Sequence, residues 1–280
     1  MGEEDFGRVG CVSGIVHFIR ERVISGGHLM DYTIYFFVFA LVLAVSFLFS
    51  MLGLGGGQLY VPIFYWLGMD LKTEAVPLSL LLNFTTQLSA ASSYLRRKLV
   101  NVTAGVPFII TMLIFPFLGA YFTKFVSVKA IIIIFALLLI VVAVQTLVGW
   151  KPTHKDFNRQ QKIIIGMIAG STIGLTVGLL GRGGGSFVVP VLLLIGFAPK
   201  RAAATSSFIV TFSSLSGFLG HAVMIQTEWK LGLVGAAAAV VGSQLGSRLM
   251  AEKMKGETLK IIFAVVLILV GLQLFLKELL

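Results

Sequence analysis

Apolar residues fill stretches of membrane-spanning length from about residue 31 to the C-terminus, and short polar connectors separate these stretches. Lipid offers no hydrogen-bond partner to backbone N–H and C=O groups, so a spanning segment must be a helix or a strand of a closed barrel. Barrel strands alternate apolar and polar residues, and runs such as Ile131-Ile132-Ile133-Ile134 show no alternation. The pattern therefore predicts an all-α polytopic membrane protein.

The same pattern occurs twice in the chain at a constant offset of 128 residues. Glycine-rich runs at 53–57 and 181–185 are each followed by a Val-Pro pair, at 61–62 and 189–190. Further matches at this offset are Ala75 with Ala203, Ser79 with Ser207, Phe135-Ala136 with Phe263-Ala264, and Gln145 with Gln273. The sequence therefore predicts two copies of one unit.

Each copy contains five apolar segments, which gives about ten transmembrane segments in all. The first copy has segments near 32–52, 58–68, 75–95, 101–122 and 129–149, and the second near 163–181, 186–196, 203–224, 230–250 and 259–277. The second segment of each copy spans only about 16 Å as a helix, roughly half of the hydrocarbon thickness. We interpret these two segments as half-helices that begin at a glycine break.

The expected organisation has four parts. Residues 1–30, which place apolar residues at helical spacing among charged ones, resemble an amphipathic segment in the membrane interface. The first five-helix repeat follows at 31–149, a cytoplasmic linker at 150–162, and the second repeat at 163–280.

An odd number of crossings per copy requires the two copies to be inverted relative to each other. The charges agree, because the loop after the third segment carries Arg96-Arg97-Lys98 in the first copy but Gln226-Thr227-Glu228 in the second. With the basic loop inside, the inner loops hold most of the Lys and Arg, and both termini lie outside. The Lys124/Lys129 loop is the exception to this charge distribution.

The composition of the chain is that of a membrane protein. Of the 280 residues, 57% are hydrophobic and 12% are charged, and the mean hydropathy is +0.98. The formal net charge of +10 comes from loop residues that set topology, so it does not indicate a nucleic-acid partner. Cys11 is the only cysteine, which leaves neither an intramolecular disulfide nor a cysteine metal cluster, and the acidic N-terminus is unlike a signal peptide.

The glycine runs are the strongest candidates for a functional site. Glycine lets membrane helices approach closely, which accounts for many glycines in such proteins. Paired Gly-broken short helices at matched positions, however, are typical of a transporter's midplane site. Their first backbone N–H groups and positive dipole ends would converge on one place that favours an anion.

Arg182 strengthens the anion hypothesis, because it lies at the glycine break between two apolar segments, whereas the other Lys, Arg, Asp and Glu residues lie in loops or at segment ends, and no intramembrane carboxylate is available to pair with it. It can also snorkel to the interface, which is the structural alternative. The third segments add polar side chains near the short helices. The candidate anion-binding residues are Gly55, Gly56, Gly57, Gln58 and Asn83 in the first copy, and Arg182, Gly183, Gly184, Gly185, Ser186, Thr205, Ser206 and Ser207 in the second.

Gly-Leu-Gly-Gly-Gly at 53–57 and Gly-Arg-Gly-Gly-Gly-Ser at 181–186, each with its Val-Pro pair, resemble the sulfite exporter TauE/SafE family of bacterial and archaeal permeases. The resemblance extends from about residue 33 to 277. It implies a multi-pass transporter in a prokaryotic plasma membrane that carries a small anion, of a sulfur-containing kind such as sulfite or an organosulfonate, by alternating access. Residues 1–30 lie outside the part that resembles the family.

The sequence leaves an anion channel open, since Gly-broken half-helices fit either mechanism. An intramembrane hydrolase using Ser186 and His221 is disfavoured, because the Gly that follows the nucleophile in a nucleophile elbow is missing and no acid is available to orient the His. We therefore expect no enzyme activity, no cofactor and no metal site. The expected partners are a small anionic substrate and membrane lipid, and the oligomeric state is left undetermined.

Overall fold

The computed structural model describes residues 28–67, 69–122, 144, 158–180, 184–221 and 229–279, and the regular elements among these residues are all helical. They are α2 (His28–Leu52), α3 (Gly57–Trp66), the π-helical turn η1 (Leu71–Ala75), α4 (Val76–Arg96), α5 (Val102–Phe122), α7 (Arg159–Leu180), α8 (Gly185–Leu194), α9 (Pro199–His221), α10 (Trp229–Glu252) and α11 (Gly256–Leu279). The interfacial segment predicted at 1–30 lies outside the described residues except for its last three residues, which begin α2. The fifth segment of the first copy and most of the linker lie outside them as well.

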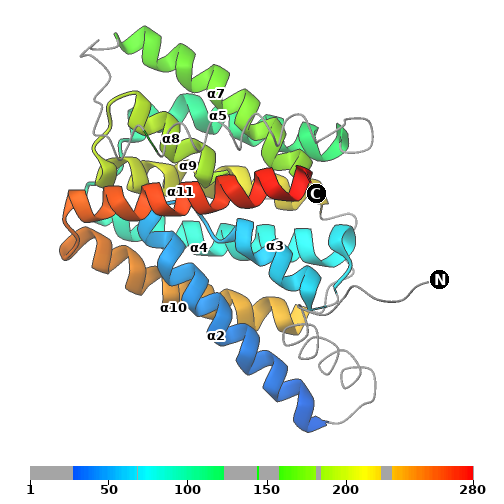
Figure 1. Ribbon diagram of the computed structural model, residues 1–280. Coiled ribbons are helices and arrows are strands. Elements are labelled where there is room, and N and C mark those ends of the chain that lie inside the picture. The colour runs from blue at the N-terminus through cyan, green and yellow to red at the C-terminus, as the bar shows by residue number, and fades with distance from the viewer. Residues whose placement is uncertain are drawn as a thin grey trace.

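The long helices are arranged as a stack of neighbours in the order α7, α5, α9, α4, α10 and α2 (Figure 1). The matched segments of the two halves are α2 and α7, α4 and α9, and α5 and α10. Replacing each helix by its match gives the same order read from the opposite end. Helices α4 and α9 therefore form the centre, and the first long helix of each half packs against the fourth segment of the other half. The short helices α3 and α8 lie against this central pair.

Close approach at the two outer pairs depends on small residues. A methyl group placed on Gly119 of α5 would lie 2.3 Å from the Leu175 carbonyl oxygen of α7, and one placed on Gly246 of α10 would lie 2.1 Å from the Phe47 carbonyl oxygen of α2. No side chain fits at these distances, so glycine allows the backbones to touch, as is usual where lipid provides no hydrophobic drive to association. This is the structural role that the sequence assigned to many of its glycines.

The distribution of polarity is that of a membrane protein. Large apolar side chains such as Ile110, Phe117 and Leu233 are exposed, whereas Asn83 and Gln87 at the centre are completely buried. Four described helices are long and apolar enough to cross a membrane, with windows Tyr35–Leu52, Val102–Gly119, Pro199–His221 and Trp229–Glu252. The predicted class, an α-helical membrane protein, is therefore confirmed.

The two short helices are present and matched. Helix α3 runs from 57 to 66 and α8 from 185 to 194, so both bounds differ by the repeat offset of 128. Ten residues span about 15 Å, half of a membrane core. The turn between α2 and α3 needs glycine because φ is +66° at Gly53 and +74° at Gly55. Both half-helices begin one residue before their predicted positions.

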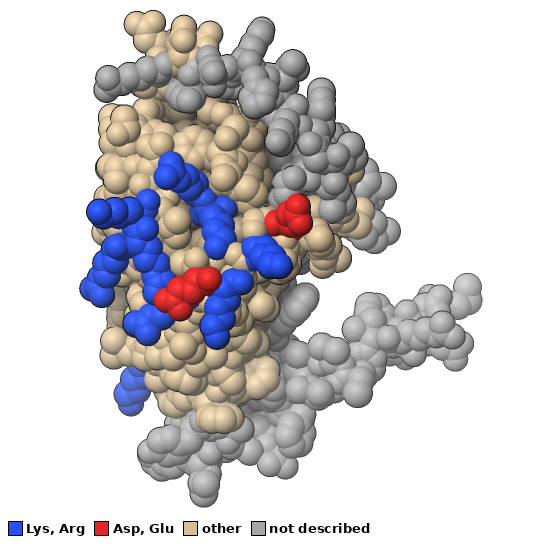
Figure 2. All heavy atoms as spheres, turned by 90° about the vertical axis from the view of Figure 1, so that its left-hand side faces the viewer, with Lys and Arg blue, Asp and Glu red and all other residues tan. Residues whose placement is uncertain are grey.

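Basic residues gather at one end of the bundle (Figure 2). At this end Arg97 forms a 2.6 Å ion pair with Glu252, and Lys200 Nζ donates a 3.2 Å hydrogen bond to the Ala251 carbonyl oxygen. The connections after α4, α8 and α10 therefore meet here. We call this the basic end; its described Lys and Arg residues are Arg96, Arg97, Lys98, Lys200, Arg201, Arg248, Lys253 and Lys255. The loops that contain most of these residues are ones that the charge pattern predicts to lie on the inner side of the membrane.

Candidate functional site

Helices α3 and α8 begin against each other. The Gln58 side-chain amide donates a hydrogen bond from Nε2 to Ser186 Oγ, and both side chains are buried. These two residues occupy the same position in the two copies, directly after the glycine runs. A methyl group on Gly185 would lie 2.1 Å from the Leu54 carbonyl oxygen, so this glycine allows the start of α8 to touch the turn before α3.

The first turns of the two helices have the same backbone geometry. The carbonyl oxygen of Gly56 accepts hydrogen bonds of 3.0 Å from the N–H groups of Leu59 and Tyr60. The carbonyl oxygen of Gly184 accepts the equivalent bonds, of 3.1 Å, from Phe187 and Val188. The N–H groups at the start of a helix have no partner within it and carry its positive dipole end. Two such ends meet at the Gln58–Ser186 contact.

Asn83 of α4 joins the first glycine run to α9. Its Oδ1 accepts a 3.3 Å hydrogen bond from the Gly57 N–H, and its Nδ2 donates to Ser214 Oγ. A methyl group on Gly55 would lie 2.1 Å from this Oδ1, so only glycine leaves room for the amide. The structure therefore brings Gly55, Gly57 and Asn83 together, as the sequence analysis expected.

The serine and threonine candidates of α9 have different surroundings. Ser206 Oγ donates a 2.8 Å hydrogen bond to the Gly53 carbonyl oxygen, which holds the α2–α3 turn against α9. Thr205 Oγ1 accepts a 3.1 Å hydrogen bond from the Asn101 N–H at the start of α5. Thr205 thus fixes a connection and does not reach the starts of the half-helices. The Ser207 hydroxyl is buried and has no hydrogen-bond partner among the described residues.

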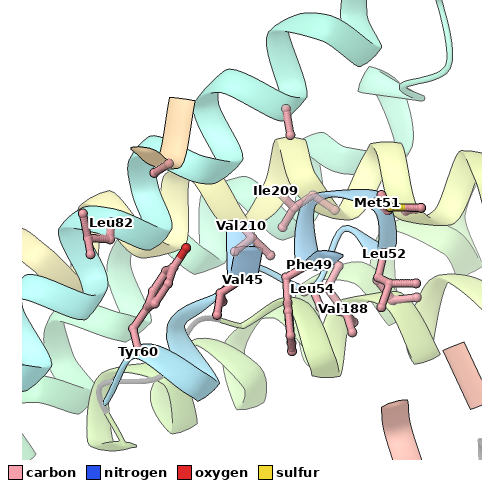
Figure 3. Close-up of a cluster of buried hydrophobic side chains, with 14 of the residues drawn as sticks. Val45, Phe49, Met51, Leu52, Leu54, Tyr60, Leu82, Val188, Ile209 and Val210 are labelled. Atoms are coloured by element: carbon pink, nitrogen blue, oxygen red, sulfur yellow. The ribbon is translucent and has the colours of Figure 1, made fainter. Parts of the chain in front are cut away.

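Tyr60 and Thr86 were not among the candidates and lie beside the first glycine run. The Tyr60 hydroxyl is 3.4 Å from Thr86 Oγ1, and a methyl group on Gly56 would lie 2.4 Å from the Tyr60 ring. Figure 3 shows Tyr60 near Leu82, with Leu54, Phe49 and Val188 grouped together. Tyr60 follows Gly56 by one helical turn, a spacing that places the two on one helix face and is visible in the sequence.

Several buried polar atoms near this region have no partner within the described part of the chain. They are Gln58 Oε1, Ser79 Oγ, Gln87 Nε2, Gln87 Oε1 and Ser207 Oγ. An unpaired polar group inside a protein costs about 1–3 kcal/mol, more than a typical hydrogen bond contributes. Gln87 was likewise not a candidate, although it follows Asn83 by four residues on the same face of α4. Unpaired groups of this kind need an explanation such as water or a ligand.

Arg182 and Gly183 lie outside the described residues, so their roles remain predictions. Gly184, which is described, is buried, and a methyl group on it would lie 2.9 Å from Val177 Cγ2. Helices α3, α4, α8 and α9 carry no Asp or Glu. The described part of the site therefore consists of backbone N–H groups, amides and hydroxyls, and these four helices offer no carboxylate to a cation.

The hydrolase alternative gains no support from the geometry. Ser186 lies against Gln58, whereas His221 Nδ1 lies 2.9 Å from the Gly217 carbonyl oxygen at the far end of α9. The described residues contain no group of three His, Cys, Asp or Glu side chains that could hold a metal ion.

A helical membrane protein with a polar interior and two half-helices that meet at their N-termini has the construction of a membrane transporter. The comparison with known proteins agrees and gives the family: residues 38–274 match the sulfite exporter TauE/SafE family, and the chain belongs to it. The resemblance seen in the sequence is thereby confirmed.

Curated relatives are named as probable membrane transporters. The probable membrane transporter protein YunE of Bacillus subtilis is 30% identical over 252 residues, which cover 80% of this chain and 91% of YunE. A probable membrane transporter protein of Haemophilus influenzae is 28% identical over 79% of this chain and 86% of its own. YfcA of Escherichia coli, also a probable membrane transporter protein, is 26% identical over 77% of this chain and 80% of its own. No solved structure matches the chain.

Proposed function

We propose that this protein transports a small anion across the plasma membrane of a prokaryote by alternating access around a site where α3 and α8 begin. The contact between Gln58 and Ser186 carries the proposal, because it joins the first turns of two matched half-helices. The positive dipole ends of the two helices then serve one binding position.

The side chains around this position suit an anion. Rotating the Gln58 amide by a half turn lets the Ser186 hydroxyl donate to Oε1 and frees Nε2 to donate to a ligand. Asn83 holds the first glycine run in place through the Gly57 N–H. We include Arg182 as the charged partner, on sequence grounds, since a guanidinium offers two parallel donors to an oxyanion. Gly183 belongs to the same run.

The proposal extends to the architecture. We infer ten membrane segments in two inverted five-helix repeats, with the basic end in the cytoplasm and both termini outside. The symmetric order of the helices and the gathering of the basic loops support this arrangement. Single cysteines at positions 98 and 228, in a Cys11→Ser background, test it with an impermeant thiol reagent added to intact cells. Labelling at 228 alone is expected, and labelling at 98 would contradict the topology.

The substrate is proposed to be a sulfur-containing anion such as sulfite or an organosulfonate, on the basis of the family's name and the donors at the site. The test has two stages. The purified protein is heated with sulfite, sulfate, thiosulfate, sulfoacetate, taurine or lactate, and a bound anion raises the melting temperature by mass action. The anion that binds is then offered to proteoliposomes in its labelled form.

A carrier is expected to show saturable uptake and counterflow, in which unlabelled anion inside the vesicle drives labelled anion inward. Flux that rises linearly with concentration and shows no counterflow would instead indicate the channel alternative. Absence of both binding and uptake for every anion in the panel would reject the proposed substrate class.

A further inference from the structure

Two buried polar side chains at the α4–α9 interface are used neither by the fold nor by the site above. Gln87 of α4 and Ser207 of α9 are both completely buried. Nε2 and Oε1 of Gln87 and Oγ of Ser207 have no hydrogen-bond partner among the described residues. Other buried hydroxyls of these helices are satisfied by backbone carbonyls, as Thr211 is by Ser207 and Thr86 is by Leu82. Gln87 and Ser207, together with Ser79 of α4, are therefore exceptions among the buried polar side chains of these two helices.

Their position along the bundle follows from the packing of α4 on α9. Asn83 bonds to Ser214, and Leu80 contacts Gly217, so residue numbers rise along α4 as they fall along α9. Gln87 follows Asn83 by four residues towards Arg96, which places it about level with Val210 on α9. Ser207 lies about 4.5 Å further along at 1.5 Å per residue, in the same direction. Both residues lie between the starts of the half-helices and the basic end.

Both side chains also lie on the faces that these helices turn towards each other. Residues four apart share a helix face, so Gln87 lies on the side of α4 from which Asn83 reaches α9. Ser207 shares its face with Ser214, the residue that Asn83 contacts, because the two are seven positions apart. The α2–α3 turn closes this region, with the Gly53 carbonyl oxygen bonded to Ser206 next to Ser207.

The side of the α4–α9 interface away from the basic end carries different side chains at the matched positions. The position matched to Gln87 is Leu215, and the position matched to Ser207 is Ser79. At these two matched positions, the side towards the basic end has an amide and a hydroxyl, and the opposite side has a leucine and a hydroxyl. The Gln87 amide is therefore the difference between the two sides at these positions.

We propose that Gln87 and Ser207 form a second binding position for the transported anion, between the half-helix site and the basic end. We call it the inner station. It rests on the proposed function, since it is a step on the same route. The Gln87 Nε2 group and the Ser207 hydroxyl donate to the anion there, and the positive charge of the basic end raises the local anion concentration at its entrance. The two faces of the membrane should then show different apparent affinities.

The experiment measures KM separately from each side, in right-side-out and inverted vesicles, with labelled sulfite or the panel anion that the wild-type protein carries. For Gln87→Leu we expect KM from the side of the basic end to rise about fivefold, the equivalent of one hydrogen bond, and KM from the other side to stay within about twofold. Ser207→Ala should change the same KM in the same direction.

The matched control is Leu215→Gln, which places an amide at the equivalent position of the other half and should leave KM from the basic end unchanged. Gln87→Leu replaces an unpaired amide by the residue that the second half carries, so its melting temperature is expected to be at least that of the wild type. If ordered water alone satisfies Gln87 and Ser207, both variants will leave the two KM values unchanged, and the inner station is refuted while the half-helix site stands. If the wild-type protein carries no anion of the panel, the proposed function and the inner station both fail.

Discussion

The two half-helices of this protein share their length, their starting residue and their first hydrogen bonds, but their surroundings differ. Around α3 the first half provides Tyr60, Asn83 and Thr86; the matched positions around α8 hold Val188, Thr211 and Ser214. The second half provides Arg182 where the first has Leu54. Matched helix starts are thus surrounded by different residues: the amides of Gln58 and Asn83 belong to the first half of the sequence, and Arg182 belongs to the second.

The proposed anion site would draw on this difference between the two halves. Each glycine run leaves room for a close neighbour, which is the Ala203 carbonyl oxygen at Gly53 and the Leu54 carbonyl oxygen at Gly185. The side chains around the runs are free to diverge, since one anion needs only one set of partners. The variants below exchange residues between the two halves to find which differences matter.

The largest effect is expected from Arg182→Leu, which copies Leu54 of the first half. We expect transport to be lost with normal expression, because the anion loses its charged partner and the membrane no longer has to hold an isolated charge. Arg182→Lys keeps the charge but loses the planar pair of donors, so it should weaken binding without abolishing it. Uptake into proteoliposomes measures both variants.

The control for Arg182→Leu is Arg248→Leu, which removes an exposed charge at the basic end and should retain transport. Unchanged apparent affinity in Arg182→Leu would show that Arg182 only snorkels and that the two halves do not differ in their anion contacts.

A large loss of stability is expected for Gly185→Ala at the start of α8. The added methyl group would lie 2.1 Å from the Leu54 carbonyl oxygen of the backbone, so the two half-helices must separate, at a cost of about 3 kcal/mol or more, at or above the top of the usual range for overpacking. Gly105→Ala is the control, because its nearest neighbours would lie 3.6 Å away and alanine favours the helix by up to about 1 kcal/mol. Thermal unfolding in detergent compares them, and equal melting temperatures would mean that the half-helices do not touch.

A smaller effect is expected for Asn83→Thr, which copies Thr211 of the second half. The variant loses the hydrogen bonds to the Gly57 N–H and to Ser214, so we expect a loss of about 1–3 kcal/mol in stability and weaker transport. Thr211→Val removes a hydroxyl that bonds only to the Ser207 carbonyl oxygen of its own helix, and it should be nearly neutral. Similar melting temperatures for the two variants would contradict the role assigned to Asn83.

The smallest effect is expected when Gln58 and Ser186 are exchanged. Gln58→Ala should weaken the binding of the anion about tenfold, because a hydrogen bond to a charged ligand is lost. The double variant Gln58→Ser with Ser186→Gln keeps both groups and should recover most of the affinity, as measured by the KM of uptake. Full loss in the double variant would show that the amide must belong to α3, so that the asymmetry extends to the contact itself.

Residue patterns along the chain were enough to predict the membrane class, the half-helices and the internal repeat. Apolar length, glycine position and the offset of 128 are properties of the chain read in one dimension, and they predicted both half-helices to within one residue at their starts. They also singled out Gln58 and Ser186 as a matched pair, and Asn83 as a neighbour of the first run. Family membership followed from the same motifs.

Which polar groups meet depends on how the helices pack in three dimensions. A serine or threonine in a membrane helix can bond to a carbonyl oxygen of its own helix, so its sequence position does not show whether its hydroxyl is free. Thr205 accepts a hydrogen bond at the start of α5, and Ser206 donates one to the α2–α3 turn. The polar atoms of the Ser207 and Gln87 side chains have no hydrogen-bond partner among the described residues. Packing between α4 and α9 fixes these outcomes, because it determines which faces are buried together and which donors are left without an acceptor.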